Sequence, residues 1–169
     1  MVKVKPQLVK DFPKLTLPLA PPGFIILIDT KEQERGNPYF KDIPCAVRQN
    51  LKTGDYSIKG FEDKITIERK HPDDLLGCMG KERLRFTREL ERMQPMYFKA
   101  IVIEGSERDM YTSTYSEMKP QSIRITLISY EIKYGVHIYY AKNRGFAERW
   151  VYDRLYYFFS RVRDGRIKL

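Results

Sequence analysis

The chain has 169 residues, and its 31 lysines and arginines outnumber its 22 aspartates and glutamates to give a formal net charge of +9. With 42% hydrophobic residues and only two cysteines, the composition is typical of one globular domain and excludes disordered chains and disulfide scaffolds. The apolar run over residues 24–28 is too short for a membrane span, and the basic excess favours a polyanionic partner, with nucleic acid before an anionic membrane surface.

Proline dominates the start of the chain, and apolar runs begin after it. Five prolines within residues 1–23 predict an extended arm, followed by one domain over residues 24–169. The residue pattern then predicts strands over residues 24–29, 45–48, 56–59, 64–69, 98–104 and 136–140. The segment over 30–42 is polar and predicts a loop, and Gly60 joins two of the strands in a hairpin.

Three helices are predicted among the later strands. Pro72 suits the first turn of a helix over residues 72–93, in which apolar residues recur at helical spacing. Pro120 begins a second helix that Gly135 ends, and a third helix runs from about residue 145 to residue 163. This order of elements predicts an α/β fold with a mixed central β-sheet flanked by helices.

Three charged residues at the end of one predicted strand carry the chemistry. Glu68-Arg69-Lys70 lies at the end of the second hairpin strand, and Asp55 lies where the first hairpin strand begins. Hairpin strands pair side by side, and residues two apart share a face of the sheet. We therefore expect Asp55, Glu68 and Lys70 to form one cluster, which Asp29 joins from the end of the first buried strand.

Carboxylates grouped in this way are hard oxygen ligands that suit Mg²⁺, and Mn²⁺ is expected to substitute for it. A metal held there lowers the pKa of a bound water and neutralises charge on a phosphate, so the predicted reaction is hydrolysis of a phosphodiester bond. Lys70 is expected to hold the attacking water or stabilise the phosphate, and Arg69 to contact phosphate or brace a carboxylate. Glu32 is expected beside the metal site. The expected metal ligands are Asp55, Glu68 and Asp29.

A longer match makes the pattern more specific. The segments ILIDTKEQ at 26–33, LKTGDYSI at 51–58 and IERK at 67–70, followed by Asp74, resemble the XPF/Hef-type nuclease domain of the restriction-endonuclease-like superfamily. The family pattern of GD, a spacer, ERK, three residues and D is complete here. The resemblance covers about residues 24–160 and implies a catalytic role for Asp74. The sequence is also similar to the small phage and bacterial members of this family.

Two departures from the family pattern bear on the site and on the partners. Lys31 stands where the family usually has an arginine, so the charge is kept and the guanidinium fork is lost. The sequence also shows neither the tandem helix-hairpin-helix module nor the helicase that larger members carry. We expect a homodimer or a separate partner protein to replace the missing module.

Basic side chains along the predicted helix over residues 72–93 are candidates for DNA binding. Several of them recur at spacings of three and four, which places them on one helix face. That face is either a ridge that contacts phosphates or a solvated surface balanced by neighbouring glutamates. The expected DNA contacts are Lys31, Arg83, Arg85, Arg88 and Arg92.

These features predict a Mg²⁺-dependent DNA endonuclease, a hydrolase that acts on phosphodiester bonds. The resemblance implies flap, fork or branched DNA as the substrate, in phage or bacterial recombination, repair or replication. We expect a cytoplasmic protein, in a bacterium or a phage-infected cell, with no membrane partner. The alternative is a non-catalytic DNA-binding or scaffolding subunit with a nuclease-like fold, which the intact motif disfavours. A sequence-specific restriction enzyme is also disfavoured, because no target-recognition region is visible.

Overall fold

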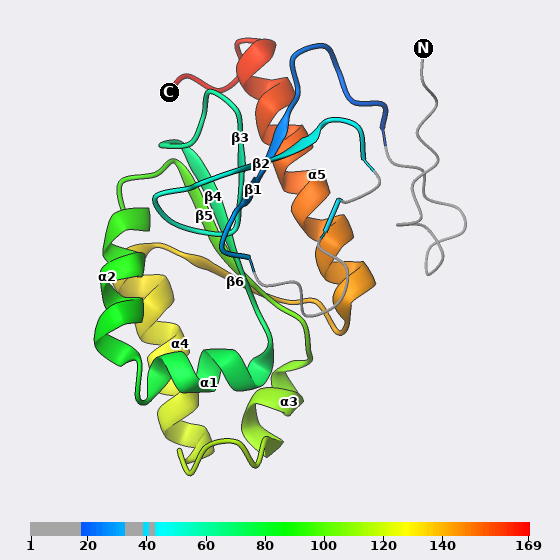
Figure 1. The fold of residues 1–169 in the computed structure, drawn as a ribbon. Coiled ribbons are helices and arrows are strands. Elements are labelled where there is room, and N and C mark those ends of the chain that lie inside the picture. Colours follow the sequence, from blue (N-terminus) through cyan, green and yellow to red (C-terminus); the bar gives the residue numbers. More distant parts are fainter. Residues whose placement is uncertain (1–17, 33–38, 41–42) are drawn as a thin grey trace.

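A six-stranded mixed β-sheet forms the centre of the molecule, and helices lie on both sides of it (Figure 1). The structure is a computed structural model that describes residues 18–32, 39–40 and 43–169. Its strands are β1 (Ile26–Asp29), β2 (Ala46–Gln49), β3 (Tyr56–Ile58), β4 (Ile65–Lys70), β5 (Phe98–Ile103) and β6 (His137–Tyr140). They follow the order β2-β1-β3-β4-β5-β6, which places the predicted hairpin of β3 and β4 at the centre of the sheet.

The directions of the strands decide which residues meet. β2 runs parallel to β1, and β4, β5 and β6 run parallel to one another, whereas β3 is antiparallel to both β1 and β4. The carboxyl ends of β1, β4 and β5 therefore lie at the same edge of the sheet as the amino end of β3. The loop predicted over 30–42 leaves from this edge, and its residues 33–38 and 41–42 lie outside the described residues.

Five helices complete the fold within the described residues, namely α1 (Pro72–Met79), α2 (Arg83–Met93), α3 (Glu107–Thr112), α4 (Pro120–Tyr134) and α5 (Arg144–Arg163). The predicted second and third helices are confirmed as α4 and α5. Gly135 ends α4 in the left-handed conformation, with a φ of 65°. The Asn143 side chain begins α5 by accepting a hydrogen bond of 3.1 Å from the Phe146 N–H.

The prediction of one continuous helix over residues 72–93 was wrong. The backbone N–H of Gly80 donates to the carbonyls of Leu76 and Gly77 and closes α1, and the chain turns before α2 begins. The short helix α3 was not predicted. Its start carries a capping box, in which the Ser106 and Asp109 side chains each accept the other residue's N–H, and that spacing is a readable signal.

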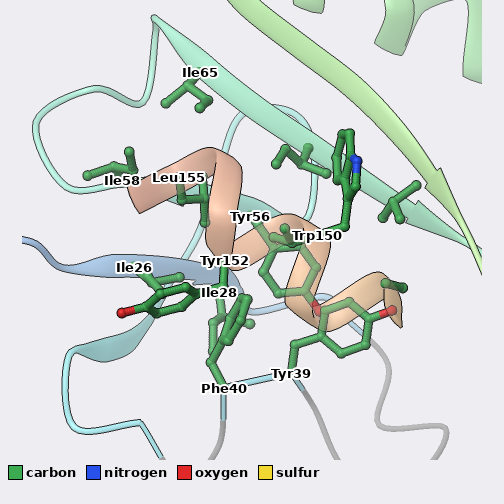
Figure 2. Packing of buried hydrophobic residues seen from close by; sticks show 14 of the residues in the cluster. Ile26, Ile28, Tyr39, Phe40, Tyr56, Ile58, Ile65, Trp150, Tyr152 and Leu155 are labelled. Atoms are coloured by element: carbon green, nitrogen blue, oxygen red, sulfur yellow. The ribbon is translucent and has the colours of Figure 1, made fainter. Parts of the chain in front are cut away.

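Two hydrophobic clusters pack on opposite faces of the sheet. Along β5, Ala100 and Val102 belong to one cluster, and the alternate residues Ile101 and Ile103 belong to the other. The first cluster is covered by α5, and the second by α1, α2, α3 and α4. Figure 2 shows side chains of α5 packed against isoleucines of the sheet, together with Tyr39 from the loop after β1.

The described part of the expected N-terminal arm, residues 18–23, contacts α5. The Tyr152 hydroxyl donates a hydrogen bond of 3.0 Å to the Pro18 carbonyl. Residues 1–17 of the arm lie outside the described residues, and the boundary placed after residue 23 stays a prediction. In the part of the chain that the structure describes, no helix is both long enough and apolar enough to span a bilayer.

Candidate active site

Acidic side chains gather where the strands end at one edge of the sheet. Asp29 ends β1, Glu68 lies near the end of β4, and Glu104 directly follows β5. Asp55 directly precedes β3, and its backbone joins the neighbouring strands. The Asp29 N–H donates to the Asp55 carbonyl over 2.8 Å, and the Asp55 N–H donates to the Ile67 carbonyl over 3.0 Å. The topology therefore brings together the acids that the sequence placed in separate segments.

Asp55 lies beside Glu68 at the end of the hairpin, as the sequence predicts. Both Tyr56 and Asp55 are matched to Ile67, because Tyr56 pairs with Ile67 in the antiparallel register and the Asp55 N–H donates to the Ile67 carbonyl. The Asp55 carboxylate is close enough for its charge to raise the pKa of Glu68. The Asp55 Oδ2 atom also accepts a hydrogen bond of 2.7 Å from the Arg69 N–H. This bond fixes the Asp55 carboxylate against β4.

Gly54 allows the chain to enter β3 with Asp55 in this position. The φ of Gly54 is 74°, in the left-handed region that favours glycine. A Cβ atom at this position would overlap the Thr66 hydroxyl, which donates a hydrogen bond of 3.1 Å to the Thr53 carbonyl. Any side chain at position 54 would push β3 away from β4 and disturb the pairing of Asp55 with Glu68.

Glu68 and Lys70 share one face of β4 and form a buried ion pair. The Lys70 ammonium donates to Glu68 Oε1 and lies 5.6 Å from the centre of the Phe86 ring. Glu68 is only 3% exposed, and its second oxygen, Oε2, is buried without a hydrogen-bond partner. Burial and the charge of Asp55 raise the pKa of Glu68 well above its ordinary value.

Lys70 stays protonated in this surrounding. Burial by itself would lower the pKa of Lys70, but the carboxylates of Glu68 and Asp55 outweigh burial and raise that pKa above its ordinary value. Lys70 therefore acts as a cation and hydrogen-bond donor toward anything that enters the site.

Arg69 points to the opposite face of β4 from the other two residues of its triplet, because side chains alternate along a strand. Its Nε and Nη2 atoms donate to the two Glu104 oxygens over 3.0 and 3.2 Å, and its Nη1 atom donates to Glu32 Oε1 over 2.8 Å. The guanidinium also lies 4.5 Å from the centre of the Tyr39 ring. Because each guanidinium nitrogen contacts a carboxylate, the geometry matches the bracing role among those expected for Arg69.

Glu104, Tyr39 and Tyr56 belong to this network, although the sequence did not predict them as site residues. The Tyr39 hydroxyl donates to Glu104 and the Tyr56 hydroxyl to Glu32, and the two rings stack with centres 5.2 Å apart. Glu104 ends an apolar strand as Asp29 does, and this shared pattern is a signal that identifies it. Tyr39 lies in a polar segment, where its aromatic neighbour Phe40 is the signal that indicates burial.

Asp29 is buried and holds the backbone beside the pair. Its Oδ1 atom accepts a hydrogen bond from the Lys31 N–H and its Oδ2 atom accepts one from the Leu51 N–H, each over 2.7 Å. These bonds fix the chain after β1 and the chain that leads to β3. In the described residues Asp29 therefore has a clear structural role next to Asp55, and its role as a metal ligand stays a prediction.

The candidate site lies in an open cleft of about 860 Å³, which the sheet edge, α1 and α2 line. Glu32 lines this cleft, and Asp74 lines it from the first turn of α1.

The predicted DNA contacts divide into two groups. Those that line the cleft are Lys31, Arg85 and Arg92, whereas those that are exposed outside it are Arg83 and Arg88.

The donor set suits a divalent cation held by two protein carboxylates. Within residues 18–32, 39–40 and 43–169, no three Asp, Glu, His or Cys side chains gather as a complete metal site. Asp55 and Glu68 nevertheless both line the cleft beside the end of β4, and the unpartnered Oε2 of Glu68 offers a buried acceptor. Mg²⁺ is commonly held by one or two carboxylates, with water and substrate phosphates completing its shell, so the residues present fit this ion.

The burial of Asp55 predicts that removing its charge stabilises the protein. Burial raises the pKa of Asp55 to about 7, against the opposing effects of Lys70 and the Arg69 N–H. The folded chain therefore binds more protons than the unfolded chain between about pH 4 and pH 7, and stability falls as pH rises through that window. We expect Asp55→Asn to raise the free energy of unfolding at pH 8 by about 1–2 kcal/mol, or the melting temperature by roughly 4 °C.

Thermal unfolding without divalent cations at pH 8 and pH 4 measures this effect. The gain should nearly vanish at pH 4, where Asp55 is protonated in the folded wild type as well. The exposed Glu117, which lies outside the cleft, provides the control variant Glu117→Gln, whose stability should follow the wild type at both pH values. An Asp55→Asn variant that is less stable than the wild type at pH 8 would contradict the interpretation.

Comparisons with known proteins agree with this geometry. Residues 28–153, well over half of the chain, match the family model of the ERCC4 domain. No curated protein sequence matches the chain.

Solved structures resemble the fold, and two of them are of XPF from Aeropyrum pernix. XPF from Aeropyrum pernix is 19% identical with a TM-score of 0.65, over 85% of this chain and 65% of that one. XPF from Aeropyrum pernix in complex with DNA is 17% identical with a TM-score of 0.64, over 82% of this chain and 66% of that one. The chain therefore spans just under two thirds of these relatives, and the likeness confirms the predicted restriction-endonuclease-like fold.

Proposed function

Because the chain belongs to the ERCC4 domain family, the family of XPF-type nuclease domains, we propose that it is a Mg²⁺-dependent DNA endonuclease that cleaves flap, fork or branched DNA. The observation that carries the proposal is the neighbouring carboxylates of Asp55 and Glu68, with an unpartnered buried oxygen, beside the protonated Lys70 in an open cleft. A relative, XPF from Aeropyrum pernix, has been solved in complex with DNA, which supports DNA as the partner.

The chain's own residues divide the work between the two faces of β4. Asp55 and Glu68 would hold the metal, which supplies an activated water and neutralises phosphate charge when bound. Lys70 donates hydrogen bonds to a phosphate oxygen or to the attacking water, because its ammonium stays charged. On the other face, Arg69 binds Glu32 and holds Asp55 through its backbone N–H. Arg69, which also lines the cleft, thereby positions Asp55 and Glu32.

A cleavage assay tests the proposal with one labelled sequence presented as linear duplex, fork, flap and four-way junction. We expect Mg²⁺-dependent cleavage that is fastest on branched forms, with Mn²⁺ replacing Mg²⁺ and chelation stopping the reaction. Equal rates on every form would contradict the structure preference. Binding to DNA without cleavage of any form would instead support the non-catalytic subunit. We further propose that this cleavage serves recombination, repair or replication in the cytoplasm of a bacterium or a phage-infected cell.

The position of Arg92 in the cleft predicts a larger contribution to DNA binding than that of Arg83. Both arginines are exposed on α2, but Arg92 alone of the two lines the cleft. Losing one phosphate contact weakens binding to every sequence and lowers the slope of log affinity against log salt by about one unit. We expect Arg92→Ala to show both effects in anisotropy titrations without metal, and Arg83→Ala to match the wild type. Equal losses in the two variants would place DNA along the outer surface of α2.

A further inference from the structure

One side of helix α5 carries aromatic and basic residues in alternation. Four residues at spacings of four, three and four form this row, namely Trp150, Arg154, Tyr157 and Arg161. We call them the α5 stripe. At about 100° per residue their side chains project within about 60° of one another, over about 16 Å of the helix. A ring followed four residues later by an arginine thus occurs twice on one side of α5.

Each arginine of the α5 stripe lies on the ring that precedes it. The guanidinium carbon of Arg154 is 4.2 Å from the centre of the Trp150 ring, and that of Arg161 is 4.6 Å from the centre of the Tyr157 ring. Trp150 in turn stacks on Tyr139 of β6, with ring centres 4.7 Å apart. Both guanidinium groups are therefore held in place before a ligand arrives, which lowers the entropy lost when their N–H groups bind one.

Among the described residues neither guanidinium of the α5 stripe contacts a carboxylate. Asp153 lies next to the stripe in sequence, but its two oxygens accept from the Arg149 Nε atom over 3.0 and 2.9 Å. Asp164 follows the helix and binds the Arg163 Nη2 atom over 3.2 Å. The acids near the stripe are therefore already paired, and the two ring-bound arginines present their charge to solvent. This arrangement favours an anionic ligand.

Exposed aromatic rings accompany these charges. Tyr157 in the stripe is 57% exposed, and so is Tyr97, whose ring packs against Phe158 of α5 with centres 5.8 Å apart. The residue after Tyr97, Phe98, lies 6.5 Å from Trp150 between ring centres. Rings open to water beside a basic surface are the usual platform on which unpaired bases stack. A duplex keeps its bases stacked inside and would leave such rings without a partner.

The α5 stripe lies apart from the candidate active site. Helix α5 covers the first hydrophobic cluster, whereas α1 and α2, which line the cleft, cover the second cluster on the opposite face of the sheet (Figure 1). No residue of the stripe lines the cleft, and neither does Tyr97. A ligand at the stripe therefore occupies a second site.

We propose that the α5 stripe, together with Tyr97, binds single-stranded nucleic acid, with its two arginines on phosphates and its exposed tyrosines stacked on unpaired bases. The combination selects this ligand, because an acidic peptide would match the charges and leave the rings unused. The site goes beyond the proposed cleavage reaction, and it holds whether or not the cleft cuts DNA.

Anisotropy titration of a labelled thymidine oligonucleotide of about 16 nucleotides tests the site, with the full chain and without metal. Tyr157→Leu should weaken binding at least about fivefold, the lower limit of the loss when one base-stacking ring is removed. The same variant should bind a duplex like the wild type, because paired bases do not reach an external ring.

The salt dependence of binding tests the two arginines. Arg154→Ala and Arg161→Ala should each lower the slope of log affinity against log salt by about 0.7, the value for one phosphate contact on a single strand, and the double variant by about 1.4. Arg163→Ala is the matched control, because it removes the same charge from the same helix outside the stripe, and its slope should equal that of the wild type. Thermal unfolding of Arg161→Ala should match the wild type, so its loss of binding is not a loss of fold.

Trp150 reports on the site directly, because it is the single tryptophan of the chain and lies under Arg154. Its fluorescence should change as the oligonucleotide is added, with the dissociation constant that anisotropy gives. A uridine oligonucleotide in the same titration separates RNA from DNA as the source of the strand, and tighter binding of either one identifies it.

Three results would overturn the proposal. A wild type that binds duplex and no single strand would exclude the ligand. An oligonucleotide that binds without changing Trp150 fluorescence, and equally well to Tyr157→Leu, would lie on another surface such as the cleft. A glutamate-rich peptide that binds as tightly as the oligonucleotide would show that the stripe takes an acidic protein segment instead.

Discussion

Replacing Glu68 with glutamine should lower the rate of DNA cleavage at least about 100-fold, because it removes a ligand charge from the proposed metal site. Glutamine keeps the shape of the buried side chain, and its amide oxygen can still accept from Lys70. DNA affinity measured without metal should persist or rise, because a negative charge that faces the phosphates has gone. The effect therefore falls on the chemical step, and single-turnover cleavage beside a binding titration separates the two.

The control for Glu68→Gln is Glu117→Gln, the same exchange at an exposed acid outside the cleft. This variant should cleave and bind like the wild type. Near-normal cleavage by Glu68→Gln would mean that the metal site is assigned wrongly. Equal losses of binding and cleavage would indicate that the exchange disturbs the fold, which thermal unfolding detects independently.

Replacing Arg69 with methionine should lower the free energy of unfolding by about 3 kcal/mol or more, or the melting temperature by roughly 10 °C. The guanidinium joins Glu32 to Glu104, and the side chains of both acids are about nine-tenths buried. Methionine has a similar length but leaves two buried carboxylates without their cation, which is costly in a medium of low polarity. Urea unfolding at pH 8, where both acids are charged in the unfolded chain, measures the loss.

Two further variants sharpen this test. Arg69→Lys keeps one positive charge but cannot contact both carboxylates in the fixed geometry of a guanidinium, so its stability should lie between those of Arg69→Met and the wild type. Arg85→Met breaks the exposed pair with Glu82, the residue before α2, and should cost much less stability than Arg69→Met. Equal losses in the free energy of unfolding for Arg69→Met and Arg85→Met would contradict the bracing role of Arg69.

Local pattern in the sequence was enough to predict the centre of the site. Asp55 directly precedes one strand of the hairpin and Glu68 lies near the end of the other, so their closeness needs only the alternation of side chains and a turn at Gly60. The starts and ends of α4 and α5 follow from proline, asparagine and glycine at their termini, which act within a few residues. The mixed sheet follows from the order of these elements.

Tertiary structure determined which residues surround that centre. Arg69 binds acids that lie 37 residues before it and 35 residues after it, and no local pattern connects such positions. Tyr39 and its neighbour Phe40 are buried because the chain after β1 folds back onto the sheet, although most of the segment over residues 30–42 is polar. The chain turns after α1 ends at Gly80. The resulting direction of α2 determines that Arg92 lines the cleft while Arg83 does not.

By itself, then, the sequence determined which charged residues lie together, since the Asp55, Glu68 and Lys70 cluster depends on contacts within one hairpin. Only the tertiary structure decided how that cluster is supported and what surrounds it. The reason is physical, because alternation along a strand and capping of a helix act over a few residues, whereas burial depends on which distant segments pack together. Arg69 shows both, since its strand places its backbone against Asp55, and the packing of β5 beside β4 brings Glu104 to its side chain.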